Sequence, residues 1–285
     1  MISLGQTALY GVAGFTLGNL ALADGGSKIA WNPWVATVVG IAVATALGLL
    51  FGAIASRSEG IYFLMITLAL AILVFYFFGQ STELSGFGGL NQILPPDLIG
   101  NPRRDPERLY YAALILCVAV YFALRYLVRT PFGITMQGIR DDPTRMRALG
   151  YNVALHRTLI FGVGAFVAAL GGVLSVWYNQ QISPGSIDVG RTIDVLVIAV
   201  IGGLLRLEGA WLGAIVFVVL DDQLRGETTR FNTYIGVVFL AIVLLSPGGL
   251  LGISSSVAGH LRRFLRDKGP GVDDPPRPAM GEPGT

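Results

Sequence analysis

Charged residues are scarce in this chain. Only 13% of its 285 residues are Asp, Glu, Lys or Arg, whereas 53% are hydrophobic and the mean hydropathy is +0.64. A soluble domain carries about 25% charged residues, so this composition excludes an ordinary cytosolic enzyme. One Cys and two His leave no disulfide framework and no metal centre to expect, and we expect no cofactor. The formal net charge of +2 is too small to indicate nucleic-acid binding.

Long apolar runs are abundant. Four of them are long enough to cross a hydrocarbon core about 30 Å thick, and two further runs also fit. The four are residues 34–54, 61–78, 109–128 and 158–178, and the two are residues 4–22 and 233–251. Residues 193–220 differ, because Arg206 and Glu208 divide them into two short pieces, which is typical of half-helices or of a re-entrant hairpin. We therefore expect an all-α, polytopic transmembrane helix bundle with six full spans and one broken or re-entrant helix pair.

The distribution of Lys and Arg predicts the orientation. If the loop at residues 129–157 is cytoplasmic, 13 of the 20 basic residues lie inside and both termini are cytoplasmic. The start carries no basic signal-peptide region, so the first run is expected to be a retained helix. Residues 1–252 form the predicted membrane domain. Residues 253–285 form a cytoplasmic basic stretch and a tail that is Gly/Pro-rich from Asp267 onward and is expected to be disordered.

The loop at residues 129–157 has helix signals at both ends. Asp142 can cap a helix that begins with Pro143, and Gly150 stands where a left-handed residue ends one, so we predict a short helix at 143–149. Upstream, Phe132, Met136 and Ile139 form an apolar stripe.

This loop also presents basic residues, Arg140, Arg145 and Arg147. Such a pair of helices can lie on the membrane or dock into a groove on a partner. The alternative is an interfacial segment that only satisfies the positive-inside rule.

Catalytic groupings are absent from the sequence pattern. Asp194 lies near a span boundary, the pairs Asp141–Asp142 and Asp221–Asp222 are expected in loops, and no Ser/His/Asp grouping can be assembled near an apolar pocket. We expect no enzyme. The chain contains no phosphate-binding loop of the G-x-x-x-x-G-K-[ST] type, so any ATP must be hydrolysed by a partner.

Small and mildly polar residues are the remaining candidates for a solute path. Glycines spaced four apart, at Gly14/Gly18, Gly48/Gly52 and Gly209/Gly213, let helices pack closely. The candidate path residues are Tyr62, Thr67, Ser85, Gly86, Asn91, Gly202, Gly203 and Gly209. The alternative is that the polar groups cap helices or bond between them, and that the glycines only pack.

Several segments together resemble a known family. They are "GIYFLMITLALA" at 60–71, "PFGITMQGIRDDPTRMRALGYNVALHR" at 131–157, "GGLLRLEGAWLGA" at 202–214 and "SPGGLLG" at 246–252. These segments are similar to permease subunits of ATP-binding-cassette importers for branched-chain amino acids, of the LivM-like type. The resemblance covers nearly all of residues 3–252.

The resemblance implies a set of partners and a coupling role for the loop. The partners are a second permease subunit, two ATPase subunits, a periplasmic or lipoprotein substrate-binding protein and the lipid of a prokaryotic plasma (inner) membrane. The residues expected to couple to the ATPase are Arg140, Asp141, Asp142, Pro143, Arg145, Arg147, Ala148, Leu149 and Gly150.

Two departures from the family pattern carry expectations of their own. Residues 3–15 resemble a segment that normally follows one or two earlier helices, so we expect those N-terminal helices to be missing. Residues 82–93 match the family's outer loop only loosely, which leaves urea or amides as alternative solutes. The alternative function is a self-contained channel or facilitator for a small neutral solute.

Overall fold

The computed structural model describes residues 3–22, 31–84, 86–96, 99–100, 102, 104–204, 207–225 and 236. The chain divides into two compact units, residues 1–197 and residues 198–285. Each unit is described by itself.

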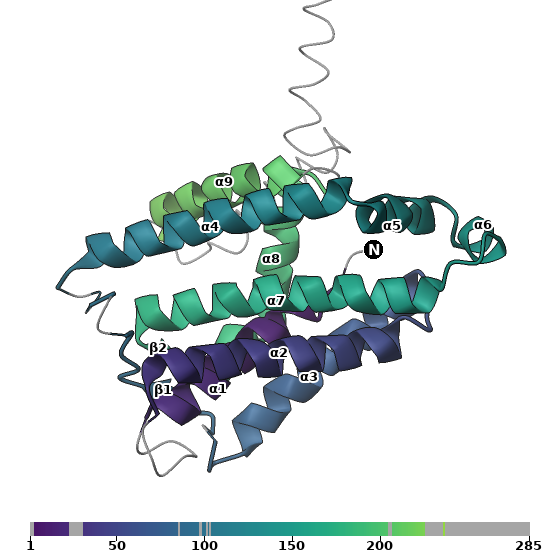
Figure 1. Ribbon diagram of the computed structural model, residues 1–285. Coiled ribbons are helices and arrows are strands. Elements are labelled where there is room, and N and C mark those ends of the chain that lie inside the picture. The colour runs from purple at the N-terminus through teal and green to yellow at the C-terminus, as the bar shows by residue number, and fades with distance from the viewer. Residues whose placement is uncertain are drawn as a thin grey trace, which may run out of the picture. The chain divides into compact units, whose positions relative to one another are not determined.

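The described part is built almost entirely from helices (Figure 1). The helices of the first unit are α1 (Gln6–Ala21), α2 (Pro33–Ala55), α3 (Ile61–Gln80), α4 (Pro106–Arg129), α5 (Pro131–Asp141), α6 (Pro143–Ala148) and α7 (Val153–Asn179). Two short strands, β1 (Leu90–Asn91) and β2 (Gln181–Ile182), pair antiparallel, and a 3-10 turn, η1 (Pro184–Ile187), follows. Helix α8 (Val189–Gly202) begins in the first unit and ends in the second, which also holds α9 (Leu207–Arg225).

Four helices are long and apolar enough to cross a membrane: α2, α3, α4 and α7. They coincide with the predicted runs at 34–54, 61–78, 109–128 and 158–178, which confirms an all-α membrane protein. The bent pair around residues 203–206 adds a fifth candidate span if its two parts count as one.

Six full spans are not confirmed. Helix α1 has only 16 residues, which at 1.5 Å per residue extend about 24 Å, shorter than a hydrocarbon core of about 30 Å. The predicted run at 233–251 lies outside the described residues, apart from the helical backbone of Gly236.

Proline and asparagine define where several helices begin. A proline occupies the first turn of α2, α4, α5 and α6, where its missing N–H costs no helix hydrogen bond. Asn32 and Asn152 cap α2 and α7 by accepting hydrogen bonds from the backbone amides of Trp34 and Leu155, at 3.0 and 3.1 Å.

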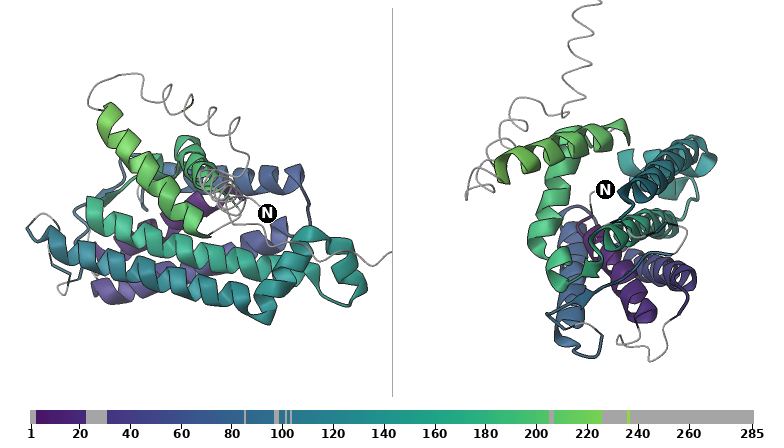
Figure 2. Two further views of the ribbon diagram at one scale, coloured as in Figure 1. Left: turned by 90° about the horizontal axis from the view of Figure 1, so that it is seen from above. Right: turned by 90° about the vertical axis from the view of Figure 1, so that its left-hand side faces the viewer.

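Helices α1, α2 and α7 pack most closely in the first unit, and Figure 2 shows them side by side in the end-on view. Glycine permits this packing: a Cβ on Gly48 of α2 would overlap Ala165 of α7, and one on Gly52 would lie 2.9 Å from the Cβ of Phe161. The contact continues toward the end of α2, where the hydroxyl of Thr158 lies 3.4 Å from that of Ser56. The predicted packing role of this glycine pair is thereby confirmed.

The two ends of the first unit differ. At one end β1 and β2 join the loops that follow α3 and α7, with Leu90 opposite Ile182 and Asn91 opposite Gln181. At the other end α5 and α6 connect α4 to α7 (Figure 1).

In the second unit, the predicted break is present between α8 and α9. A Cβ on Gly202 or on Gly213 would overlap a backbone carbonyl, that of Gly209 or of Ile198 respectively, so the two segments approach at backbone distance. One expectation is wrong here: Asp221 and Asp222 belong to the last turns of α9 rather than to a loop. The helix continues through these positions because an acidic residue can still form the backbone hydrogen bonds of a helix. Its charge limits how deep the residue can lie in hydrocarbon, and does not by itself end the helix.

Candidate functional site

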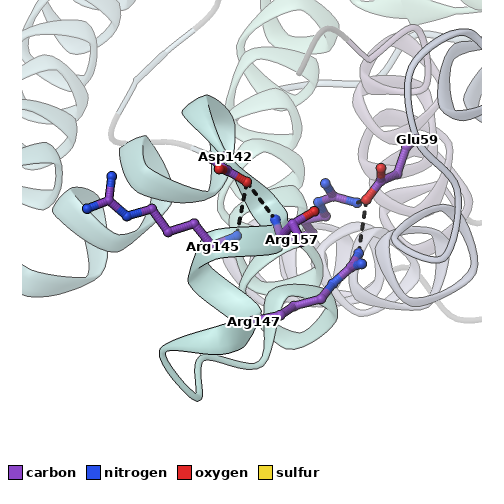
Figure 3. Close-up of polar contacts among 6 residues, drawn as sticks. Glu59, Asp142, Arg145, Arg147 and Arg157 are labelled. Atoms are coloured by element: carbon purple, nitrogen blue, oxygen red, sulfur yellow. Dashed lines mark hydrogen bonds and ion pairs between the residues drawn. The ribbon is translucent and has the colours of Figure 1, made fainter.

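Helix α6 forms as the loop sequence predicts. The Asp142 side chain accepts hydrogen bonds from the backbone amides of Thr144 and Arg145, at 2.9 and 3.0 Å (Figure 3). Pro143 follows as the first helical residue. Both free amides at the start of this short helix are therefore satisfied by one carboxylate, which also suits the positive end of the helix dipole.

The other end of α6 is closed by Gly150, whose φ is +88°. Its amide donates to the carbonyl of Arg147 at 2.9 Å, and the amide of Tyr151 donates to the carbonyl of Met146 at 3.1 Å. These two bonds form a Schellman motif, in which a left-handed residue satisfies the last carbonyls of the helix.

Most of the predicted coupling residues are exposed. Pro143 is half-buried, whereas Arg140, Asp141, Asp142, Arg145, Arg147, Ala148, Leu149 and Gly150 are exposed. Leu149 is 66% exposed, although it is a large apolar side chain. The structure thus brings this predicted set together on one surface, formed by the end of α5, by α6 and by its C-terminal turn.

The apolar stripe of α5 faces the chain's own bundle rather than solvent. Ile139 is buried, and Phe132 and Met136 are half-buried along a groove of about 470 Å³. The Phe132 ring also stacks on His156 of α7, with centroids 5.7 Å apart. Helix α5 is therefore held against α7, and α6 projects beyond it.

An ion-pair cluster connects α6 to the membrane helices. Oε1 of Glu59, in the turn between α2 and α3, lies 3.0 Å from Nη2 of Arg147 and 3.1 Å from Nη1 of Arg157 (Figure 3). The Arg157 side chain is only 4% exposed, whereas those of Glu59 and Arg147 are about half exposed, at 52% and 57%. Sequence reasoning missed Glu59, because no local pattern links it to residues 88 and more positions away.

The candidate path residues are dispersed in the first unit. Tyr62 is 74% exposed on α3, whereas Thr67 is fully buried and its hydroxyl accepts a hydrogen bond from the amide of Leu4 at 3.3 Å. Asn91 lies in β1, and Gly86, with a φ of +57°, lies in the loop before it. Ser85 lies outside the described residues.

The remaining path candidates, Gly202, Gly203 and Gly209, belong to the second unit. They pack against one another at the break between α8 and α9, and Gly203 has a φ of +107°. The path assignment stays a prediction.

Metal-ligating side chains do not gather in the part of the chain that the structure describes. No group of three or more His, Cys, Asp or Glu residues there could hold a metal ion.

Comparison with known families shows which protein family the chain belongs to. Residues 1–247 match the family described as the permease component of the branched-chain amino acid transport system. The chain belongs to this permease family. The apolar helices and the family membership together show that the chain is a multi-pass membrane protein.

Individual relatives agree with the family match. The permease is 26% identical over 242 residues to the high-affinity branched-chain amino acid transport system permease protein LivM of Escherichia coli K12, which covers 76% of this chain and 57% of the relative. It is also 26% identical over 253 residues to the probable branched-chain amino acid transport permease protein LivM of Methanocaldococcus jannaschii, covering 78% of this chain and 71% of the relative.

A more distant relative carries a different name. Over 138 residues the permease is 28% identical to the galactose/methyl galactoside import permease protein MglC of Salmonella typhimurium, covering 46% of this chain and 38% of the relative. No solved structure matches the chain. The permease thus spans little more than half the length of the Escherichia coli relative.

Proposed function

We propose that this chain is a transmembrane permease subunit of an ATP-driven importer for branched-chain or other small neutral amino acids. ATP is hydrolysed by separate subunits. The observation that carries this proposal is α6, a capped and exposed basic helix at one end of an apolar bundle whose chain belongs to a permease family. The names of the two LivM relatives support branched-chain amino acids as the solute.

The proposed complex contains a second permease subunit, two ATPase subunits and a periplasmic or lipoprotein substrate-binding protein. It resides in the plasma (inner) membrane of a prokaryote, with α6 and both termini in the cytoplasm. The excess of Lys and Arg on the α6 side supports this orientation, because basic loops remain cytoplasmic. In that arrangement α6 faces the compartment that supplies ATP.

The nine coupling residues predicted between Arg140 and Gly150, which exclude Thr144 and Met146, are proposed to contact the ATPase. Arg145 and the exposed Leu149 offer a charged and an apolar group at the free end of α6. A groove on the ATPase with acidic groups and a small apolar pocket would complement them.

Reversing the charges on α6 tests this role. The single variant Arg145→Glu changes no residue of a membrane helix and leaves the contact between Arg147 and Glu59 in place, so normal insertion is expected, together with weaker ATPase co-purification and leucine uptake. The double variant Arg145→Glu/Arg147→Glu also removes that contact and should lose both. Gly88→Ala is the matched control, because a Cβ there meets open space. Uptake that persists in the double variant, or in cells without any partner ATPase, would favour a channel or facilitator instead.

A further inference from the structure

Glu59 is the residue of the α2–α3 turn that α6 contacts through a side chain in the described part of the chain. Within the described residues, the contact between Glu59 and Arg147 is the only side-chain hydrogen bond or ion pair that joins α6 to that turn. No residue of α6 is fully buried, although Pro143 and Met146 are half-buried, so buried packing contributes little to this connection. A displacement of α6 therefore reaches the ends of α2 and α3 through a polar contact.

The two arginines hold Glu59 in different ways. Arg157 is buried on α7 and forms an ion pair with Glu59, 3.1 Å from Nη1 to Oε1, without hydrogen-bond geometry. Loss of this pair would leave a buried guanidinium without its carboxylate, which makes the pair costly to break. Arg147 is exposed and meets the same oxygen, Oε1, through one nitrogen only. The inner pair is a fixed anchor, whereas the outer pair can form or break at low cost when α6 moves.

The Glu59–Arg157 pair adjoins the contact between α2 and α7, where the two helices pack closely. Toward the end of α2, Gly52 packs on Phe161 and Ser56 lies beside Thr158, just before the Glu59–Arg157 pair. Because Gly52 and Phe161 leave no free space between the helices, a pull on Glu59 moves the ends of α2 and α7 together.

We propose that Glu59 is a positioning residue that transmits movement of α6 to the membrane helices through Arg147, with Arg157 as its anchor. This inference rests on the proposed function. It assigns a role to an acidic residue outside the loop at 129–157.

The cleanest test removes only the outer contact. Arg147→Gln leaves the buried Arg157–Glu59 pair intact and takes away the contact with α6. The full-length chain is assembled with its partner subunits in proteoliposomes, and leucine uptake and ATP hydrolysis are measured on the same sample. Arg145 and Leu149 stay available to contact the ATPase subunits, so we expect these subunits to remain bound. Leucine imported per ATP should fall by about threefold to fivefold, the effect expected from a partly exposed ion pair.

Two further variants separate transmission from a merely structural effect. Arg147→Lys keeps one positive nitrogen for Oε1 and should retain the wild-type ratio, because the contact is not bidentate. Arg57→Gln removes a positive charge from an exposed residue of the same turn that forms no ion pair with the described residues, and should also retain it. A variant that merely unfolds lowers uptake and hydrolysis together, without changing their ratio.

Glu59→Gln closes a double-mutant cycle. If Arg147 acts through Glu59, adding Arg147→Gln to Glu59→Gln causes no further fall in leucine imported per ATP. A wild-type ratio in Arg147→Gln overturns the inference alone. Absence of ATP-dependent uptake by the assembled wild-type complex overturns both the inference and the proposed function.

Discussion

Gly48 of α2 lies directly against Ala165 of α7, so closely that a Cβ atom on the glycine would overlap the alanine methyl group. The two helices thus approach at a distance that only a glycine allows. Gly52 lies one turn further along α2, Ser56 caps the helix, and Glu59 lies in the turn that follows; each of them contacts a residue of α7. The close contact between α2 and α7 therefore lies next to the ion-pair cluster and limits how far these two helices can move relative to each other.

Gly48→Ala should destabilise the chain by about 1–3 kcal/mol, because an extra methyl group in a packed interface forces the helices apart. Adding Ala165→Gly moves the methyl group to the other helix and should restore most of the lost stability. The thermal unfolding midpoint in detergent reports both changes. An unchanged midpoint for Gly48→Ala would contradict the close approach of α2 and α7.

Asp142→Ala should cost about 1 kcal/mol of local stability, because it removes the acceptor of two backbone amides at the start of α6. Asp142→Asn keeps a side-chain oxygen and serves as the control. Hydrogen exchange of the amides of Thr144 and Arg145 measures the effect, and equal exchange in the alanine and asparagine variants would exclude the cap.

Gly150→Val should cost about 1–2 kcal/mol, because a β-branched residue does not tolerate a φ of +88°. Gly150→Asn should be mild, since asparagine adopts left-handed conformations more readily. Hydrogen exchange at Tyr151, whose amide bonds to Met146, reports whether the end of α6 stays closed. Equal protection in both variants would show that the closure does not depend on the backbone of residue 150.

The orientation can be tested with single cysteines in a chain whose Cys117, exposed on α4, is replaced by alanine. A cysteine at Thr144 in α6 should react only with reagents that reach the cytoplasm. One at Asn91 in β1, near the opposite end of the first unit, should react with impermeant reagents from outside (Figure 1). The reverse labelling pattern would remove the proposed coupling role from α6.

Local signals in the sequence sufficed for part of the fold. The four confirmed spans are long apolar runs, and α6 is bounded by a cap, a proline and a glycine that act within a few residues. The residues at the α6 surface could therefore be named in advance. The apolar residues from 4 to 22 predict a full span for the first run, although the helix there contains only 16 residues.

Long-range pairings could not be predicted in the same way. The partners of Glu59 follow from how α2, α6 and α7 meet, and no periodicity encodes a contact across 88 residues. The inward orientation of the α5 stripe likewise depends on the groove beside α7, which exists only once the helices have packed.

Leucine uptake into proteoliposomes tests the central claim most directly. The chain is reconstituted with its permease, ATPase and binding-protein partners, and uptake is compared with ATP, without ATP, and with an ATPase subunit that binds but cannot hydrolyse ATP. We expect leucine to accumulate against a gradient only when ATP is hydrolysed. Equal uptake in all three conditions, or by this chain alone, would contradict it and identify a passive channel.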